Sequence, residues 1–219
     1  MSEKNPALIL LVHGLWMSGF ELGVLKHRLE SDGQFRAISF SYPSITGSMS
    51  DHVDSLIDFA RAQRTDQLHF VGHSLGGLVV LKALQLTDDL PDGRAVLLGT
   101  PVQGSRAARG VARLLPFGKA ILGAAVNAEI VECAPREWSG RRDVGVIAGS
   151  MGLGLGRLFA ELNTDHDGTV LVEETHLPGA KDQVVVSTSH TGMLFSSEIA
   201  QQTAHFLKHG AFDKPTSGS

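Results

Sequence analysis

A serine stands between glycines in the segment FVGHSLGG, in the pattern Gly72-x-Ser74-x-Gly76. One apolar run precedes this pattern and another follows it, as a buried strand and a buried helix would. A sharp strand-to-helix turn strains the serine backbone, so both ±2 positions must be nearly free of side chains. The turn exposes the hydroxyl, and the amides of the following helix point at it, where they can stabilise an oxyanion. The spacing therefore predicts that Ser74 is a nucleophile.

The residues of this segment allow two other interpretations. The serine could simply cap a helix after a tight turn, or the glycines could form a phosphate-binding loop. The sequence contains neither G-x-x-x-x-G-K-[ST] nor G-x-G-x-x-G, so the nucleotide-binding interpretation lacks its residues. The nucleophile and the plain capping turn are the alternatives that the segment leaves open.

A serine hydroxyl is a weak nucleophile until a general base takes its proton, and that base is most often histidine. The sequence contains ten histidines. In this arrangement the chain order is Ser, Asp, His, and the base follows the last strand. His190 directly follows the run VVVSTS and meets this requirement. We therefore expect His190 to be the base, whereas the turn should direct His73 away from the site.

Two carboxylates in the segment TDHDGTV are candidates for the acid of the triad. Asp167 precedes Gly168, which allows the turn to present a carboxylate inward, and Asp165 is the second choice. The acid would hold the histidine tautomer and stabilise the imidazolium. The pair of carboxylates could also bind a divalent ion, but no further ligands cluster with it in the sequence. We expect Asp167 to be the acid, and no metal or cofactor.

The oxyanion would need two backbone N–H donors. One is expected from Leu75, directly after the nucleophile, and the other from the loop VHGLW after the first strand, where Leu15 follows a glycine. Trp16 and Met17 adjoin this loop and are candidates for substrate binding. Residues of these types more often have an ordinary place in the core or at the surface.

Strand-like and helix-like segments alternate along the chain and would position these side chains. Continuous apolar runs predict strands, and apolar residues at helical spacing predict helices. We expect Ser50 to cap the helix at 50–63. This alternation predicts an α/β fold, with a mostly parallel sheet and helices on both faces. We expect strands at 7–12, 35–43, 67–72, 94–100, 143–150 and 183–190, and helices at 20–33, 50–63, 75–86 and 196–209.

The alternation is interrupted from about 102 to 142, where only helical pieces rich in alanine, glycine and leucine are expected. We expect one domain over 1–219, with a core at about 5–101 and 143–211 and a disordered tail at about 212–219. The interruption, here called the cap segment, would be a short helical cap or lid. Cys133 lies within it and is expected to be a packing residue.

Composition excludes several classes of protein. The 219 residues carry a net charge of −4, which offers no basic surface for nucleic acid. The N-terminal apolar run is too short for a membrane span and lacks the features of a secretory signal, so we expect no stable membrane insertion. The single cysteine allows no intramolecular disulfide. A cytoplasmic protein is therefore expected, and the sequence does not indicate its oligomeric state.

The motifs VHGLW, GHSLGG, LGTPVQGS, DHDGTV and SHTGML follow one another over nearly the whole chain. In this order they resemble the α/β-hydrolase superfamily, and within it the small serine esterases and lipases. The resemblance implies Ser74, Asp167 and His190 as the triad, Leu15 and Leu75 as oxyanion donors, and a helical cap after GTPVQGS. SHTGML differs from the acidic histidine loop of the secreted lipases, which favours a small intracellular esterase.

The function expected from the resemblance is hydrolysis of carboxylic esters through an acyl-enzyme, on a small hydrophobic ester substrate. A thioesterase or an acyltransferase would use the same triad, and the sequence does not separate these activities. A non-catalytic binding module of the same fold is a remote alternative, because such modules usually lack a triad member and all three are present here.

Overall fold

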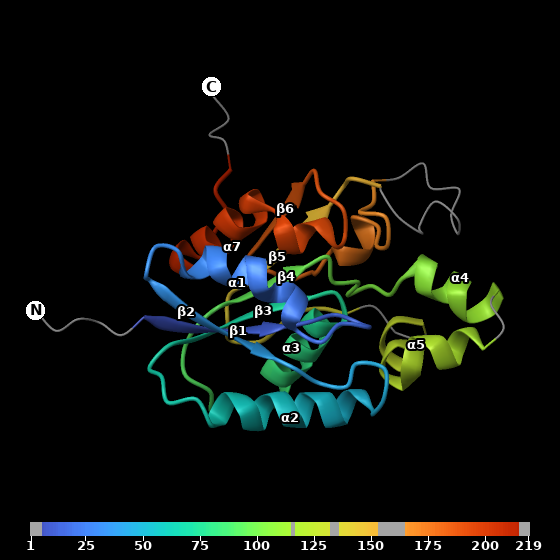
Figure 1. Cartoon of the computed structure of the whole chain (residues 1–219), viewed down its shortest axis with the longest axis horizontal. Helices are drawn as coiled ribbons and strands as arrows, with labels where there is room; N and C mark the ends of the chain where they lie inside the picture. Colours follow the sequence, from blue (N-terminus) through green and yellow to red (C-terminus); the bar gives the residue numbers. More distant parts are fainter. Residues whose placement is uncertain (1–5, 115–116, 132–135, 153–164, 215–219) are drawn as a thin grey trace, which may run out of the picture.

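The computed structural model of the chain describes residues 6–114, 117–131, 136–152 and 165–214. These residues contain a six-stranded sheet in the order β2-β1-β3-β4-β5-β6, in which every neighbouring pair is parallel (Figure 1). The mostly parallel sheet predicted from the alternating pattern is therefore confirmed. The strands are β1 (Ala7–Val12), β2 (Phe35–Phe40), β3 (Leu68–His73), β4 (Ala95–Leu98), β5 (Val144–Gly149) and β6 (Asp182–Val186).

The central strands are apolar on both faces because helices cover both sides of the sheet. Every residue of β3, β4 and β5 is buried. The helices α1 (Gly23–Glu30) and α7 (Ser197–His209) cover one face, and α2 (Met49–Arg61) and α3 (Leu75–Leu86) cover the other (Figure 1). Two apolar clusters, one on each face, fill the space between sheet and helices.

The register of the sheet brings the chemically important loops together. Val12 at the end of β1 is paired with Gly72 near the end of β3. Because parallel strands have their carboxyl ends at the same edge, the loops after β1, β3, β4, β5 and β6 meet there. Short 3-10 turns lie in or near these loops: η1 (Phe20–Leu22), η3 (Glu173–Thr175) and η4 (Gly192–Phe195).

Some element boundaries differ from those predicted. The first predicted helix is divided into the turn η1 and the helix α1. The predicted cap Ser50 is wrong: Ser48 caps α2, with its hydroxyl accepting the Asp51 N–H while the Asp51 carboxylate accepts the Ser48 N–H. This reciprocal pair satisfies two helix-end donors at once, which Ser50, already inside the helix, cannot do.

The cap segment contains the helices α4 (Arg106–Leu114) and α5 (Gly118–Val126) and the π-helical turn η2 (Asn127–Val131). Its described residues contain no strand, and α4 and α5 lie beyond the carboxyl edge of the sheet (Figure 1). Cys133 falls outside the described residues.

The packed chain continues further than the predicted end of the core at 211. Phe212 is buried, and Lys214 forms an ion pair with Asp182. The expected start of a disordered tail at 212 is therefore wrong, because Phe212 packs against Phe206 of α7. The rest of the predicted tail, 215–219, lies outside the described residues. Among the described helices, none has the length and apolar character needed to cross a membrane.

Candidate active site

Ser74 lies on the turn between β3 and α3. Its φ of 54° falls in the left-handed region, which a residue with a side chain adopts only at a cost. A Cβ atom added at Gly72 would lie 2.5 Å from the Gly77 Cα, and one added at Gly76 would lie 2.3 Å from the Val12 carbonyl oxygen. Both glycines of the motif are therefore required by close backbone approaches that the turn creates.

His190 and Asp167 form a hydrogen-bonded pair in neighbouring loops. The His190 Nδ1 lies 2.7 Å from the Asp167 Oδ2, and the Asp167 side chain is 1% exposed. A second bond runs between the backbones, from the His190 N–H to the Asp167 carbonyl oxygen at 2.8 Å. Because an ionised carboxylate only accepts, the Nδ1 carries the proton, and the Nε2 is left for other partners.

The remaining acceptor capacity of Asp167 is used by its own loop. Its Oδ1 accepts the N–H groups of Thr169 at 2.9 Å and Val170 at 2.7 Å. Asp165 is exposed, and its carbonyl oxygen accepts the Val172 N–H instead. Of the two candidate acids, the structure brings Asp167, and not Asp165, into contact with the histidine.

Gly99, directly after β4, lies against this pair. Its φ is +54°, and an added Cβ would lie 3.0 Å from the His190 Nδ1 and 3.1 Å from the Asp167 Oδ2. A side chain at this position would push the histidine and the carboxylate apart. Gly99 was not predicted from the sequence, although a glycine directly after a buried strand is a signal of close approach.

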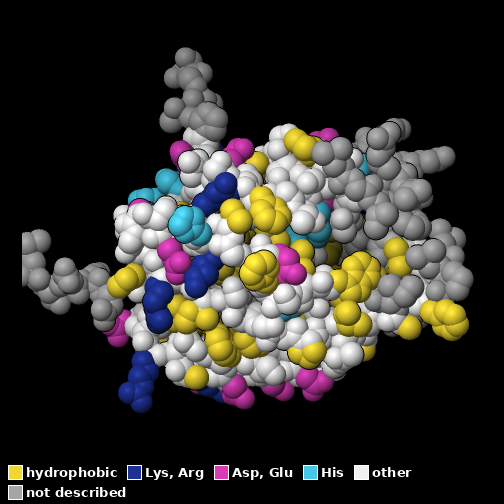
Figure 2. Space-filling model, viewed as in Figure 1, with side chains coloured by type: hydrophobic (Ala, Val, Ile, Leu, Met, Phe, Trp, Pro, Cys, Tyr) yellow, Lys and Arg dark blue, Asp and Glu magenta, His cyan; other side chains and the backbone are white. Residues whose placement is uncertain are grey.

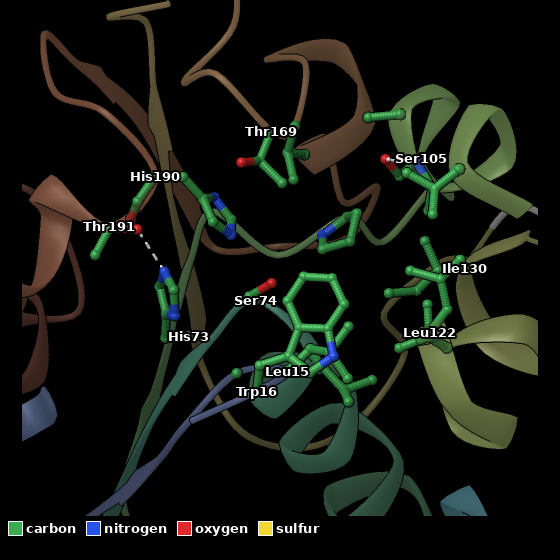
Figure 3. A pocket seen from close by; sticks show the side chains of 18 of the residues that line it. Leu15, Trp16, His73, Ser74, Ser105, Leu122, Ile130, Thr169, His190 and Thr191 are labelled. Carbon is green, nitrogen blue, oxygen red and sulfur yellow. Dashed lines mark hydrogen bonds between the residues drawn. The ribbon is translucent and has the colours of Figure 1, made fainter. Parts of the chain in front are cut away.

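His73 contradicts the prediction that the turn directs it away. Its ring lies 4.7 Å from the His190 ring, and its Nε2 lies 3.1 Å from the His190 carbonyl oxygen, to which it donates (Figure 3). Burial above all, and then the neighbouring His190, lowers the pKa of His73 to about 3. The prediction failed because β3 continues through His73, which points the side chain toward the loop of His190.

The loop after β1 is anchored beside the serine. An added Cβ at Gly14 would lie 3.0 Å from the Ser74 Cβ, so the loop packs closely against the serine side chain. The His13 Nε2 accepts the Tyr42 N–H at 3.2 Å, and its Nδ1 therefore donates to the Gly14 carbonyl oxygen at 2.9 Å. Burial lowers the pKa of His13, which favours this neutral form. The Tyr42 ring stacks on His13, and its hydroxyl donates to the His13 carbonyl oxygen at 2.9 Å.

A cavity of about 380 Å³ opens at this edge of the sheet, and every predicted site residue except the buried Asp167 borders it. Figure 3 shows the side chains of Ser74 and His190 directed into the same space, with Trp16 below it. Figure 2 shows a hollow right of centre with hydrophobic and histidine side chains at its margin. The cap segment contributes an apolar wall: Ala107, Ala108, Val111, Leu122, Val126 and Ile130.

The structure places the candidate oxyanion and substrate residues around this cavity. Leu15 and Leu75 both border it, as Ser74 does. Trp16 is 55% exposed, and Met17 is half-buried against the core. Within the described residues, no three His, Cys, Asp or Glu side chains come together as a possible metal site.

The parallel sheet, the serine on the β3–α3 turn and the His–Asp pair in later loops define the class of α/β-hydrolase folds. The family model described as "Alpha/beta hydrolase family" matches residues 9–186. The chain belongs to this family.

Known proteins agree with this assignment. Esterase YbfF of Escherichia coli (strain K12) is 29% identical over 113 residues, which span 46% of this chain and only 42% of that protein. The lipase BlEst2 of Bacillus licheniformis, in its mature form, shares the fold with a TM-score of 0.73 at 18% identity, over 95% of this chain and 92% of that one. The carboxylesterase CesB (YbfK) of Bacillus subtilis gives a TM-score of 0.61 at 14% identity, over 94% and 85%.

Proposed function

We propose that the protein is a carboxylic ester hydrolase that uses Ser74 as nucleophile, His190 as general base and Asp167 as the orienting acid. The observation that carries the proposal is the 2.7 Å bond between His190 Nδ1 and Asp167 Oδ2, at a cavity that also holds a strained serine. The names of the esterase and lipase relatives support the same class of reaction.

In the first half of the proposed reaction, the His190 Nε2 takes the proton of the Ser74 hydroxyl as that oxygen attacks the ester carbonyl. The carbonyl oxygen becomes an oxyanion, which accepts hydrogen bonds from the Leu15 and Leu75 amides. His190 then gives its proton to the leaving alcohol. An acyl-enzyme on Ser74 remains.

In the second half, water takes the place of the alcohol. His190 removes a proton from the water as it attacks the acyl carbonyl, and returns a proton to the Ser74 oxygen as the acid leaves. Throughout, the Asp167 carboxylate holds the histidine orientation and stabilises the imidazolium. None of these steps uses a metal ion or an organic cofactor.

The cavity suggests the kind of ester. Its volume of about 380 Å³ lies in the range of sites for small molecules, and the cap segment supplies an almost wholly apolar wall. We propose a small hydrophobic ester whose acyl chain lies against the cap segment, with Trp16 and Met17 at the edge. The single cysteine fits a reducing compartment, and we propose a cytoplasmic location.

The proposal is tested with two series of substrates, p-nitrophenyl esters and the matched acyl thioesters, with acyl chains of about two to twelve carbons. The kcat/KM of each ester is compared with that of the thioester with the same acyl chain. An esterase should show its highest kcat/KM on the oxygen esters. A clear preference for the thioesters would instead establish the thioesterase alternative, and acyl transfer to an added alcohol in preference to water would establish the acyltransferase. No turnover of either series by folded protein would favour a binding module.

A further inference from the structure

The residue after the proposed oxyanion donor Leu15 has an unusual backbone. Trp16 has a φ of 60°, in the left-handed region that bulky side chains rarely adopt. Such a conformation is energetically costly and persists only where surrounding structure holds it. The contacts that hold Trp16 therefore bear on the direction of the neighbouring Leu15 amide.

A serine from another loop supplies such a contact. The Trp16 N–H donates to the Ser44 Oγ at 3.1 Å, and the Ser44 residue is 5% exposed. Ser44 lies in a tight turn, which the Thr46 N–H closes by donating to the Pro43 carbonyl oxygen at 3.0 Å. The acceptor is thus held on a short, closed turn after β2.

The peptide units on both sides of Leu15 are therefore fixed by hydrogen bonds. On the N-terminal side, the His13 ring donates to the Gly14 carbonyl oxygen at 2.9 Å. The N–H of a trans peptide points opposite to its carbonyl, so this bond directs the Leu15 N–H away from the His13 ring. On the C-terminal side, the Ser44 hydroxyl holds the peptide between Leu15 and Trp16.

The turn of Ser44 also contacts the cap segment. Gly123 of α5 has a φ of +79°, and a Cβ atom added there would lie 2.3 Å from the Ile45 carbonyl oxygen. The cap backbone therefore packs directly on this turn. The position of Ser44 is set from two sides, by its own loop and by α5.

We propose that Ser44 is a positioning residue for the oxyanion hole: its hydroxyl holds the Trp16 backbone so that the Leu15 amide faces the reacting carbonyl. This inference rests on the proposed ester hydrolysis. Ser44 acts through the loop and does not border the cavity itself.

The test compares three variants. Ser44→Ala removes the acceptor, and Ser44→Thr restores a hydroxyl at the same place. Ser48→Ala is the matched control, because Ser48 lies four residues later in the same connection and caps α2 without contact to the oxyanion loop. For each variant, kcat and KM on a p-nitrophenyl ester, the Ki of a trifluoromethyl ketone that forms a tetrahedral adduct, and the Tm are measured.

We expect Ser44→Ala to lower kcat by about 10- to 100-fold with little change in KM, because a misplaced donor weakens the transition state more than the ground state. The ketone should bind more weakly by a similar factor, and Ser44→Thr should recover most of both losses. Ser48→Ala should lower the Tm but leave kcat unchanged, because it removes only a helix cap.

Three outcomes would overturn the inference. If Ser44→Ala keeps the wild-type kcat and Ki while wild type hydrolyses esters and Ser74→Ala does not, the proposed function stands and the role of Ser44 is wrong. Equal losses in Ser44→Ala and Ser48→Ala, accompanied by equal losses in Tm, would show a purely structural role. An inactive wild type would instead overturn the proposed function, and this inference with it.

Discussion

At the scale of single residues, the carboxylate of Asp167 is held by hydrogen bonds on both of its oxygens. It accepts two backbone N–H groups through one oxygen and the His190 Nδ1 through the other, and it is shielded from water. Both carboxylate oxygens are therefore held by hydrogen bonds, which fixes the orientation of the histidine that donates to one of them. Asp165, two residues earlier, is exposed and lies outside this arrangement.

Substitution of the two aspartates by asparagine separates their roles. Asp167→Asn should lower kcat by about 10³–10⁴-fold, because an amide N–H facing His190 favours the wrong tautomer. Asp165→Asn, the matched control, should remain within about twofold of wild type, as exposed substitutions usually do. The measurement is kcat of both variants on one p-nitrophenyl ester. A larger loss in Asp165→Asn would show that Asp165, and not Asp167, is the acid of the triad.

Sequence reasoning identified residues whose place depends on local turns and chain order. Ser74, Asp167 and His190 were predicted in this way, and the structure brings the last two into contact. Ser44 and His73 were missed as contributors to the site. Their contacts join residues far apart in the chain, and the packing of whole elements decides which side chain meets which backbone group.

At the scale of elements, the loop that carries Asp167 also holds the cap segment. Glu174, which is buried, accepts the Arg106 N–H at the start of α4 through one carboxylate oxygen and the Leu171 N–H through the other. The Glu174 carbonyl oxygen accepts the Gln103 N–H at 3.0 Å. Because the same loop carries Asp167 and contacts the first cap helix, a shift of α4 should displace the Asp167 carboxylate.

The cap segment should set the preferred chain length of the acyl group. Ala107 of α4 borders the cavity, so Ala107→Phe should fill part of it and lower kcat/KM for long esters by at least about 10-fold, with acetate esters little affected. Ala124→Phe is the matched control, because Ala124 is exposed on α5 and does not border the cavity. The chain-length profile of p-nitrophenyl esters gives the answer. Identical profiles for both variants would place the acyl chain elsewhere.

The place of the cap segment could be predicted from the sequence, because strand patterns are absent there. Its contacts with the rest of the protein could not be predicted. The break in alternation after 102 indicated that no strand follows there directly. In the described residues of the cap segment, the regular elements are all helical. The first residue of α2 could not be predicted correctly, because Ser48 and Ser50 are both residues that commonly cap helices. Only the reciprocal bonds with Asp51 distinguish them.

At the scale of the whole molecule, folding buries histidines that must stay neutral. Burial first, and then the charges of Arg94 and Arg142, lower the pKa of His69 to about 4. His73 and His13 are shifted in the same direction by burial. Between pH 6.5 and these lowered values, the unfolded chain binds protons that the folded chain does not. The free energy of unfolding therefore falls as the pH falls through this range.

His69 allows this pH dependence to be measured apart from catalysis, because it lies in β3 and its Nδ1 accepts the Arg94 N–H. His69→Asn keeps an acceptor but no longer titrates. Between about pH 6.5 and 4, the wild type should lose about 1.4 kcal/mol per pH unit more than the variant does. Urea unfolding at several pH values measures this difference. Parallel pH profiles would show that His69 is not held neutral by the fold.

The central claim is that Ser74 is the nucleophile, and it is tested most directly by reaction with a fluorophosphonate followed by peptide mapping. This reagent phosphonylates an activated serine with loss of fluoride, whatever the natural ester is. We predict one adduct per chain, located on Ser74, and no adduct in a folded Ser74→Ala variant. A label on another residue, or no label on folded wild-type protein, would contradict it.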